Sequence, residues 1–272
     1  MPESRPASEW SPAIPPAASS DPAAWEADSA SPSLGSTQTA GSPAYELKFV
    51  LDENLAALLE RHFSGWLTLD PHADPKLDHC YQITSLYTDT PRFDVFHREP
   101  GHRRSKYRVR SYGDSNRVYF EKKTKSGQRV RKTRVAVEAA ELRWLAECGA
   151  DGEWSGNGYR TELLRRSLRP VCQISYLRRA YFACTAEGRL RLTFDRELQG
   201  AAASHWTFAA GASPSRFGEG RVICEFKFQK ALPSAFKRAI EEFRLEPTGF
   251  SKYRTFLESA GLAAPRGESA CA

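Results

Sequence analysis

Residue character alternates strictly along several short segments of this chain, and this pattern restricts the fold more than any other feature. In Tyr45–Leu51 the charged residues Glu46 and Lys48 alternate with the apolar residues Leu47 and Phe49. Side chains two residues apart share one face of a β-strand, so such a segment predicts a strand with one charged and one apolar face. The same analysis predicts seven more strands, at residues 80–89, 105–112, 117–124, 129–137, 171–183, 189–198 and 222–229.

Helical patterns fall between the strands. Residues 52–62 open with an acidic cap, Asp52, and carry Leu55, Leu58 and Leu59 on one face, which predicts a helix. Further helices are expected at 138–148, 161–168, 233–243 and 251–260, and a long loop is expected at 199–220. Many strands with few helices favour an α+β fold, a closed eight-stranded antiparallel β-barrel with the helices packed outside.

Composition divides the chain into three parts. Residues 1–42 are rich in Ala, Pro and Ser and cannot bury enough apolar surface to offset chain entropy, so disorder is expected there. Residues 43–262 hold the predicted elements and form one domain, and residues 263–272 are expected to be a loose tail. The first segment has five acidic residues and one basic residue, so the net charge of +6 for the whole chain becomes +10 for the remainder. A basic domain suggests an anionic partner.

The sequence also argues against several kinds of protein. Its six cysteines are scattered without a Cys-x-x-Cys pair, which favours reduced thiols of a cytosolic protein and disfavours a zinc site. No apolar run reaches about 18 residues, so no membrane span is expected. The N-terminus lacks the basic and apolar regions of a secretory signal. A cytoplasmic location is therefore expected.

Charged residues occupy one face of nearly every predicted strand. These faces hold Lys106, Arg108 and Arg110; Glu121 and Lys123; Lys132 and Arg134; Arg191 and Asp195; and Glu225 and Lys227. The polar face of an antiparallel sheet usually meets water, and this interpretation suits any single strand. If the helices instead cover the apolar faces, the charged faces point at one another inside the barrel. So many cations in a confined space need an anionic ligand to balance them.

Several short motifs follow one another in an order that matches a known family. They are Tyr45-Glu-Leu-Lys48, Ser85-Leu-Tyr-Thr-Asp-Thr90, Tyr107-Arg-Val-Arg110, Phe120-Glu-Lys-Lys123, Lys132-Thr-Arg134, Tyr176-Leu-Arg178, Arg189-Leu-Arg-Leu-Thr-Phe-Asp195, Glu225-Phe-Lys227 and Phe250-Ser-Lys-Tyr253. Over about residues 44–261 the chain resembles the VTC domain, the polyphosphate polymerase domain of the vacuolar transporter chaperone complex, and its bacterial relatives. That domain belongs to the triphosphate tunnel metalloenzymes.

The resemblance implies roles for individual residues. The cations expected to contact the reacting phosphates, and so to be catalytic, are Lys48, Arg108, Arg110, Lys123, Arg178, Arg191 and Lys252. Further phosphate-binding cations are Lys132, Arg134 and Lys227. A divalent metal, Mn²⁺ or Mg²⁺, is expected at Glu225, with Glu46 or Glu121 assisting by coordination or by fixing a neighbouring cation.

Two departures from the tunnel hydrolases bear on the activity. Ala44 stands where those enzymes usually have the first acid of Glu-x-Glu-x-Lys, and the last strand has Glu225-Phe-Lys227 instead of paired acids. Both differences favour an ATP-dependent polyphosphate polymerase over two-metal hydrolysis.

Other functions stay open at this point. One alternative is a metal-dependent triphosphatase in the same tunnel, and another is a non-catalytic polyphosphate-binding or nucleic-acid-binding module. Nucleic acid is disfavoured because the charged strands lack the aromatic platform on which bases stack. The expected ligands are ATP and polyphosphate or triphosphate. The sequence leaves open the oligomeric state and a membrane partner, for which the N-terminal segment could serve as a tether.

Overall fold

The computed structural model of the protein describes residues 39–40, 44–126, 129–147, 154–208 and 213–264. The expected disorder of residues 1–42 and the expected tail at 263–272 fall mostly outside these ranges. So do two of the cysteines, Cys148 and Cys271; the four described cysteines are free thiols. In the described part of the chain, no helix is both long enough and apolar enough to cross a membrane.

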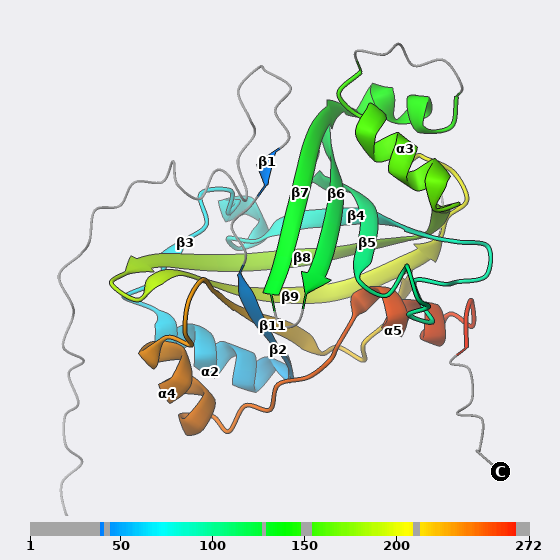
Figure 1. The fold of residues 1–272 in the computed structure, drawn as a ribbon. Helices are drawn as coiled ribbons and strands as arrows, with labels where there is room; N and C mark the ends of the chain where they lie inside the picture. The colour runs from blue at the N-terminus through cyan, green and yellow to red at the C-terminus, as the bar shows by residue number, and fades with distance from the viewer. Residues whose placement is uncertain (1–38, 41–43, 127–128, 148–153, 209–212, 265–272) are drawn as a thin grey trace, which may run out of the picture.

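Within the ranges given above, one antiparallel sheet of eleven strands forms the body of the molecule (Figure 1). Eight strands are long, and they confirm the eight that the sequence predicts. They are β2 Tyr45–Leu51, β4 Tyr81–Asp89, β5 Ser105–Tyr112, β6 Arg117–Ser126, β7 Arg129–Glu138, β8 Arg169–Thr185, β9 Gly188–Ala202 and β11 Val222–Phe228. Three strands have two residues each: β1 Thr39–Ala40, β3 Thr68–Leu69 and β10 Ser215–Arg216. The main path runs β1-β7-β6-β5-β4-β8-β9-β11-β2.

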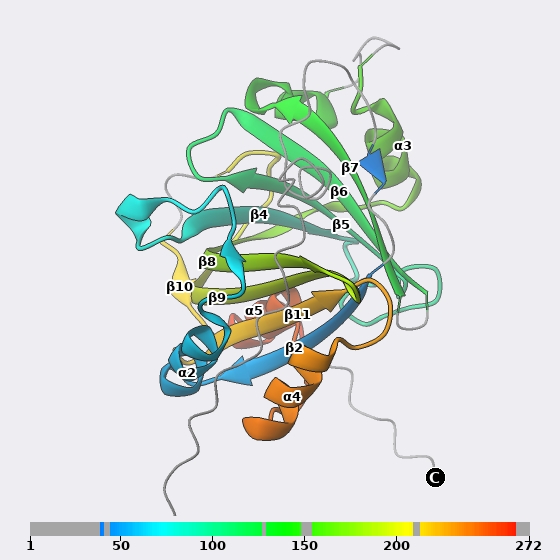
Figure 2. The ribbon, with the colours of Figure 1, turned by 90° about the vertical axis from the view of Figure 1, so that its left-hand side faces the viewer.

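The sheet curls until its outermost long strands, β2 and β7, meet at one end (Figure 2). There Ala44, just before β2, exchanges two backbone hydrogen bonds with Val130 of β7, at 3.3 and 3.2 Å. In the described chain this isolated bridge is the whole of the pairing between the two edges. The sheet is therefore curled into a trough, and we call the line where β2 and β7 meet the seam. The predicted closed barrel is not shown, because no continuous ladder of hydrogen bonds joins these two strands in the described chain.

The expected loop at 199–220 is wrong at its beginning, because β9 continues to Ala202 and β10 pairs with it. Backbone pairing sustains this part of β9: Gly200 lies opposite Ile174 of β8, and Ala202 lies opposite Cys172. The run Gly200-Ala-Ala-Ala203 carries no alternation of side-chain character. A strand made of such small residues gives no period-two signal.

In the described residues, four α-helices and two short 3₁₀-helices flank the sheet. They are α2 Glu53–Phe63, α3 Asn157–Arg165, α4 Ser234–Glu242, α5 Lys252–Ser259, η1 Pro75–Leu77 and η2 Ala139–Leu145. The predicted cap Asp52 accepts a hydrogen bond from the Leu55 amide at 2.8 Å. The α-helix expected at 138–148 is the shorter 3₁₀-helix η2. The helix expected at 161–168 begins earlier, at Asn157, where the poor helix former Gly158 hides its start.

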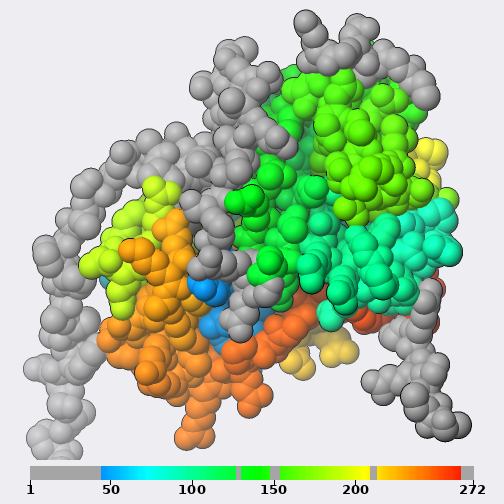
Figure 3. Space-filling model, viewed as in Figure 1, coloured from blue at the N-terminus to red at the C-terminus, as the bar shows by residue number. Residues whose placement is uncertain are grey.

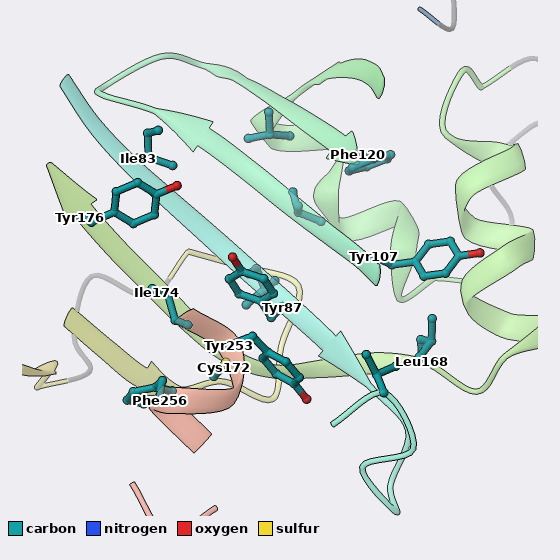
Figure 4. Packing of buried hydrophobic residues seen from close by; sticks show 14 of the residues in the cluster. Ile83, Tyr87, Tyr107, Phe120, Leu168, Cys172, Ile174, Tyr176, Tyr253 and Phe256 are labelled. Atoms are coloured by element: carbon teal, nitrogen blue, oxygen red, sulfur yellow. The ribbon is translucent and has the colours of Figure 1, made fainter. Parts of the chain in front are cut away.

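Helices cover the apolar outer face of the sheet in two places. Beneath β2, β9 and β11, the buried side chains Phe49 and Phe226 pack with Phe63 of α2 and Phe236 of α4. A second core lies around β4, β5, β6 and β8, where α3, η2 and α5 contribute (Figure 4). Because the apolar faces are taken up by these cores, the charged faces of the strands turn toward the concave side of the trough.

Candidate functional site

Two adjoining cavities lie on the concave side of the sheet. The larger has a volume of about 400 Å³ and the smaller about 80 Å³, and both are lined by Glu46, Arg108, Arg110 and Lys123 among others. Fifteen lysines and arginines line the two cavities together, against three carboxylates, Glu46, Glu121 and Glu225. This excess of positive charge in an enclosed space favours a polyanionic ligand.

Three lysines lie side by side across neighbouring strands. In the registers of β5, β6 and β7, Lys106 is opposite Lys123, and Lys123 is opposite Lys132. Like charges directly opposite one another destabilise a sheet. Burial, together with neighbouring cations, lowers the pKa of Lys106 to about 7 and the pKa values of Lys123 and Lys132 to about 8. We call these three residues the lysine row.

Glu121 is the counter-ion at the centre of one half of the site. Its carboxylate is buried and accepts from Arg108 at 2.7 and 2.8 Å, while Lys132 and Arg134 each approach to 2.7 Å. Burial alone would raise the pKa of Glu121, but Lys132, Arg108 and the other guanidinium groups outweigh it and hold the pKa well below its usual range. Both oxygens are thus engaged by cations of this chain.

Lys48 lies between the two remaining carboxylates of the cavity. Its Nζ is 2.6 Å from Glu225 and 2.9 Å from Glu46. Glu46 also pairs with Lys123 at 3.2 Å, and this contact crosses the seam from β2 to β6. Burial opposes ionisation of both carboxyl groups, but the neighbouring lysines, first among them Lys48, hold their pKa values below the usual range.

Asp195 on β9 joins two of the predicted cations. Arg178 of β8 donates to both carboxylate oxygens, at 2.6 and 2.7 Å, and Lys252 of α5 donates at 2.6 Å. All three residues are buried. The sequence placed Asp195 on a charged face but predicted no role for it. Its partners lie on another strand and on a helix, so no local pattern could identify it.

Two further cations are oriented by neutral or loop groups that the sequence did not single out. Arg191 donates to the Asp70 carboxylate at 2.8 Å and to the Tyr81 hydroxyl at 2.9 Å. Arg110 donates to Ser85 at 3.0 Å and to the Tyr176 hydroxyl at 3.1 Å. Ser85 and Tyr176 sit in motifs that the sequence analysis quoted, whereas Asp70 is in a segment without periodicity.

The structure brings all thirteen predicted site residues to the concave side, and twelve of them line the cavities. The twelve are Glu46, Lys48, Arg108, Arg110, Glu121, Lys123, Lys132, Arg178, Arg191, Glu225, Lys227 and Lys252. Arg134 lies behind them, paired with Glu121 and donating to the Tyr112 hydroxyl at 2.6 Å. Its Nη1 and the Oγ1 of Thr193 are buried polar atoms without a hydrogen-bond partner in the described chain.

A basic rim lies along one side of the larger cavity, and the sequence analysis missed it. Arg98, Arg103 and Arg104, in the loop between β4 and β5, line this side and are exposed. The segment that leads into α5 forms the opposite wall (Figure 3, blue-green against orange-red). We call these three arginines the rim arginines; none of them forms an ion pair with a described residue. They lie in a loop, where strand periodicity gives no prediction.

The donor set partly fits a divalent cation. Glu46 and Glu225 present ionised carboxylate oxygens on neighbouring strands, and such hard ligands suit Mg²⁺ or Mn²⁺. Glu121 fits less well, because four cations already surround it. Among the described residues no group of three or more His, Cys, Asp or Glu side chains is placed to hold a metal. Phosphate oxygens of a ligand would therefore have to complete the coordination.

Comparison with known proteins gives a family match and several similar structures. A family model described as the VTC domain matches residues 43–260, which hold all thirteen predicted site residues. No curated protein matches the chain. A candidate adenylate cyclase from Bacillus halodurans is 12% identical, and the match covers 78% of this chain and 95% of that one with a TM-score of 0.48.

Two other solved structures are similar to a comparable degree. A candidate adenylyl cyclase from Hippeastrum, described as having a dominant triphosphatase activity, is 14% identical, with 82% and 98% of the two chains covered and a TM-score of 0.46. The PH1819 protein from Pyrococcus horikoshii is 16% identical, with 79% and 99% covered and a TM-score of 0.43.

Proposed function

The chain belongs to the VTC domain family, and from this premise we propose that it is an ATP-dependent phosphotransferase that lengthens polyphosphate. The observation that carries the proposal is the lysine row. Three ammonium groups placed opposite one another cost free energy in the ligand-free protein, and a chain of phosphates offsets that cost by supplying negative charge at regular intervals.

The reaction needs positioning and charge stabilisation, and no protein nucleophile. A terminal oxygen of the acceptor polyphosphate attacks the γ-phosphorus of ATP, and a new P–O–P bond forms. The bond between the γ-phosphorus and the β,γ-bridging oxygen breaks, ADP leaves, and the acceptor becomes one phosphate longer. Arg108 and Arg110 offer planar guanidinium groups that match phosphate oxygens, and the lysine row offers point charges. Together they would hold donor and acceptor phosphates in line.

The carboxylates have separate tasks in this proposal. Glu225 and Glu46 would hold Mn²⁺ or Mg²⁺, and the metal would neutralise charge on the phosphate oxygens. Glu121 would keep Arg108, Lys132 and Arg134 in place as their shared counter-ion. Asp195 would do the same for Arg178 and Lys252.

We also propose that the trough acts as a closed tunnel when it holds its ligand. Two contacts across the seam support this idea, the Ala44–Val130 bridge and the ion pair of Glu46 with Lys123. A polyanion bound to cations on both sides of the seam would add further attraction between the edges. Since the proposed donor is ATP, we place the protein in the cytoplasm.

A metal-dependent triphosphatase is the second candidate. The observation in its favour is the carboxylate pair Glu46 and Glu225, which opens onto the larger cavity. Water would then replace the acceptor phosphate as the attacking group. Incubation with tripolyphosphate and metal separates the two reactions: stoichiometric release of orthophosphate supports hydrolysis, whereas no release, together with polyphosphate synthesis from ATP, supports transfer.

The decisive test is synthesis by the purified full-length chain. We expect it to form polyphosphate from ATP with Mn²⁺ or Mg²⁺, visible as a ladder on a gel. A Lys123→Met variant should lose this activity, whereas Lys237→Met, at an exposed position on α4, should keep it. Failure of the folded wild-type chain with every metal, together with retained binding of tripolyphosphate, would reduce the protein to a binding module.

A further inference from the structure

Asp89, at the end of β4, is a buried carboxylate that organises the loop following it. Its oxygens accept backbone hydrogen bonds from Thr90 at 2.7 Å, Val95 at 2.8 Å and Phe96 at 2.9 Å. In the described chain no lysine or arginine forms an ion pair with it, so hydrogen bonds alone compensate its charge. The loop that it fixes leads directly to the rim arginines.

The fourth donor to Asp89 comes from the opposite wall of the larger cavity. The hydroxyl of Tyr253, in the first turn of α5, donates to Asp89 Oδ2. The Tyr253 ring stacks on Tyr87, with ring centroids 5.4 Å apart and an interplanar angle of 20° (Figure 4). Burial and the charge of Asp89 raise the pKa of Tyr253, so its hydroxyl stays protonated and remains a donor.

The neighbouring residues of Tyr253 reach into the site. Lys252 donates to Asp195 on β9 at 2.6 Å and lies 4.7 Å from the ring centroid of Tyr176. Ser251 accepts from Lys106 of the lysine row at 3.3 Å. Three consecutive residues thus contact four strands, β4, β5, β8 and β9. Tyr253 itself lines the larger cavity, but its hydroxyl donates to Asp89, which does not line the cavity.

The start of α5 depends on such external contacts. The helix has eight residues, and the side chain at its N-cap, Ser251, makes no capping hydrogen bond. A short helix without a cap frays at its first turn, and Lys252 is its first residue. The ammonium group of Lys252 is at the end of a long flexible side chain, and ordering that side chain costs conformational entropy.

We propose that Asp89 and Tyr253 form a positioning pair that holds Lys252 in the phosphate site. Asp89 does not line the cavity; by accepting from the Tyr253 hydroxyl it fixes the first turn of α5 on β4, so that Lys252 stays at Asp195. The inference rests on the proposed function in one respect, that Lys252 contacts phosphate. Its geometric part, that the pair fixes the position of Lys252, does not depend on any ligand.

The geometric part is tested by chemical protection of Lys252 in the full-length protein. The residue is 8% exposed, so acetic anhydride should modify it slowly. We expect Tyr253→Phe to increase the rate of Lys252 acetylation several-fold, as measured by mass spectrometry of the peptide that contains it. The matched control is Tyr107→Phe. Tyr107 is as buried as Tyr253, at 2% exposure, and its hydroxyl also donates to a carboxylate, Glu162 at 2.7 Å, away from Lys252. An unchanged rate in Tyr253→Phe would overturn the proposal.

The functional part is tested by a double-mutant cycle on tripolyphosphate binding. We expect Tyr253→Phe to weaken binding about tenfold, in the range for a lost hydrogen bond to a charged group. In a Lys252→Gln background the same change should have no effect, because the pair then has no lysine to position. Equal weakening in both backgrounds, or no weakening by Lys252→Gln, would refute the positioning role. Absence of wild-type binding would instead count against the proposed function, and the acetylation result would still decide the geometry.

Discussion

At the scale of single residues, the site is a set of cations whose protonation depends on what they bind. The pKa values of Lys106, Lys123 and Lys132 are about 7, 8 and 8 in the ligand-free protein, below the ordinary value of 10.5. A bound polyanion favours the charged form of each lysine and should raise these values. Ligand binding and proton uptake are therefore coupled at the lysine row.

This coupling predicts the pH dependence of binding. As the pH rises from 7 to 9, the lysine row loses protons, so affinity for tripolyphosphate should fall. At pH 8 binding should take up protons, which calorimetry in buffers of different ionisation enthalpy measures. Lys106→Met should reduce the number of protons taken up. A constant affinity from pH 7 to 9 would contradict the prediction.

The stability of the ligand-free protein should change in the opposite direction. A lysine whose pKa is lower in the folded chain than in the unfolded chain leaves more protons on the unfolded chain above pH 7. The free energy of unfolding should therefore rise from about pH 7 toward pH 10. Tyr112, whose pKa burial alone would raise but Arg134 lowers to about 7, contributes with the same sign. Thermal unfolding across this range checks the expectation.

Sequence alone predicted which residues face the site but not which residues hold them there. Arg178 and Lys252 follow from the family motifs, whereas their shared partner Asp195 was assigned no role. Asp70, the partner of Arg191, lies in a loop. Contacts between distant segments decide these pairings, and period-two patterns contain no information about such contacts.

At the scale of elements, α5 depends on a close approach to β9. A Cβ atom added at Gly200 would lie 2.3 Å from the Phe256 ring of α5, far inside van der Waals contact. Gly200→Ala should therefore push α5 away and lower the free energy of unfolding by about 1–3 kcal/mol. It should also weaken tripolyphosphate binding, because Lys252 moves with the helix.

A second glycine provides the control for this prediction. A Cβ at Gly158, within α3, meets no atom within 4 Å. Gly158→Ala should leave binding unchanged and leave stability equal or slightly higher, since alanine favours helix. Denaturant unfolding of the two variants makes the comparison, and equal effects would argue against a tight α5–β9 contact.

Long elements with regular patterns were predicted well, and irregular ones were not. The eight strands carry alternating side chains, and each one appears in the structure. The end of β9 was missed because Gly200 and the alanines after it present no pattern, although β8 pairs with them. Closure of the barrel was predicted but is not shown, because a single isolated bridge joins the two edges in the described chain. Whether β2 and β7 meet depends on the curvature of the sheet, and alternation of side-chain character does not predict that curvature.

At the scale of the whole molecule, positive charge continues from the cavity onto the outside. The larger cavity is lined by the rim arginines of the β4–β5 loop and by residues at the start of α5. A triphosphate is short enough to be held by the cations inside. In the proposed function, a longer polyphosphate would pass over the rim arginines as it leaves the cavity.

The rim predicts a dependence on chain length. Wild-type protein should bind long polyphosphate more tightly than tripolyphosphate and with a steeper dependence on salt. Replacing Arg98, Arg103 and Arg104 with Gln should remove most of this gain and reduce the salt slope by about 2 to 3, while tripolyphosphate binding stays the same. The control replaces the exposed residues Lys237, Arg238 and Arg244, on and beside α4, and should alter neither. An undiminished preference for long chains in the rim variant would contradict the prediction.

The two-residue strand β1 affects how a mechanical force on the N-terminal segment would act on the sheet. Thr39 and Ala40 precede the family match, yet they pair with Arg134 and Thr133 on the open border of β7, one residue from Lys132. A chain trimmed to residues 43–260 would keep every motif but would leave Thr133 and Arg134 of β7 without this strand partner. A pulling force applied to the chain before Thr39 would therefore be transmitted to β7, next to Lys132, through the short β1–β7 pairing.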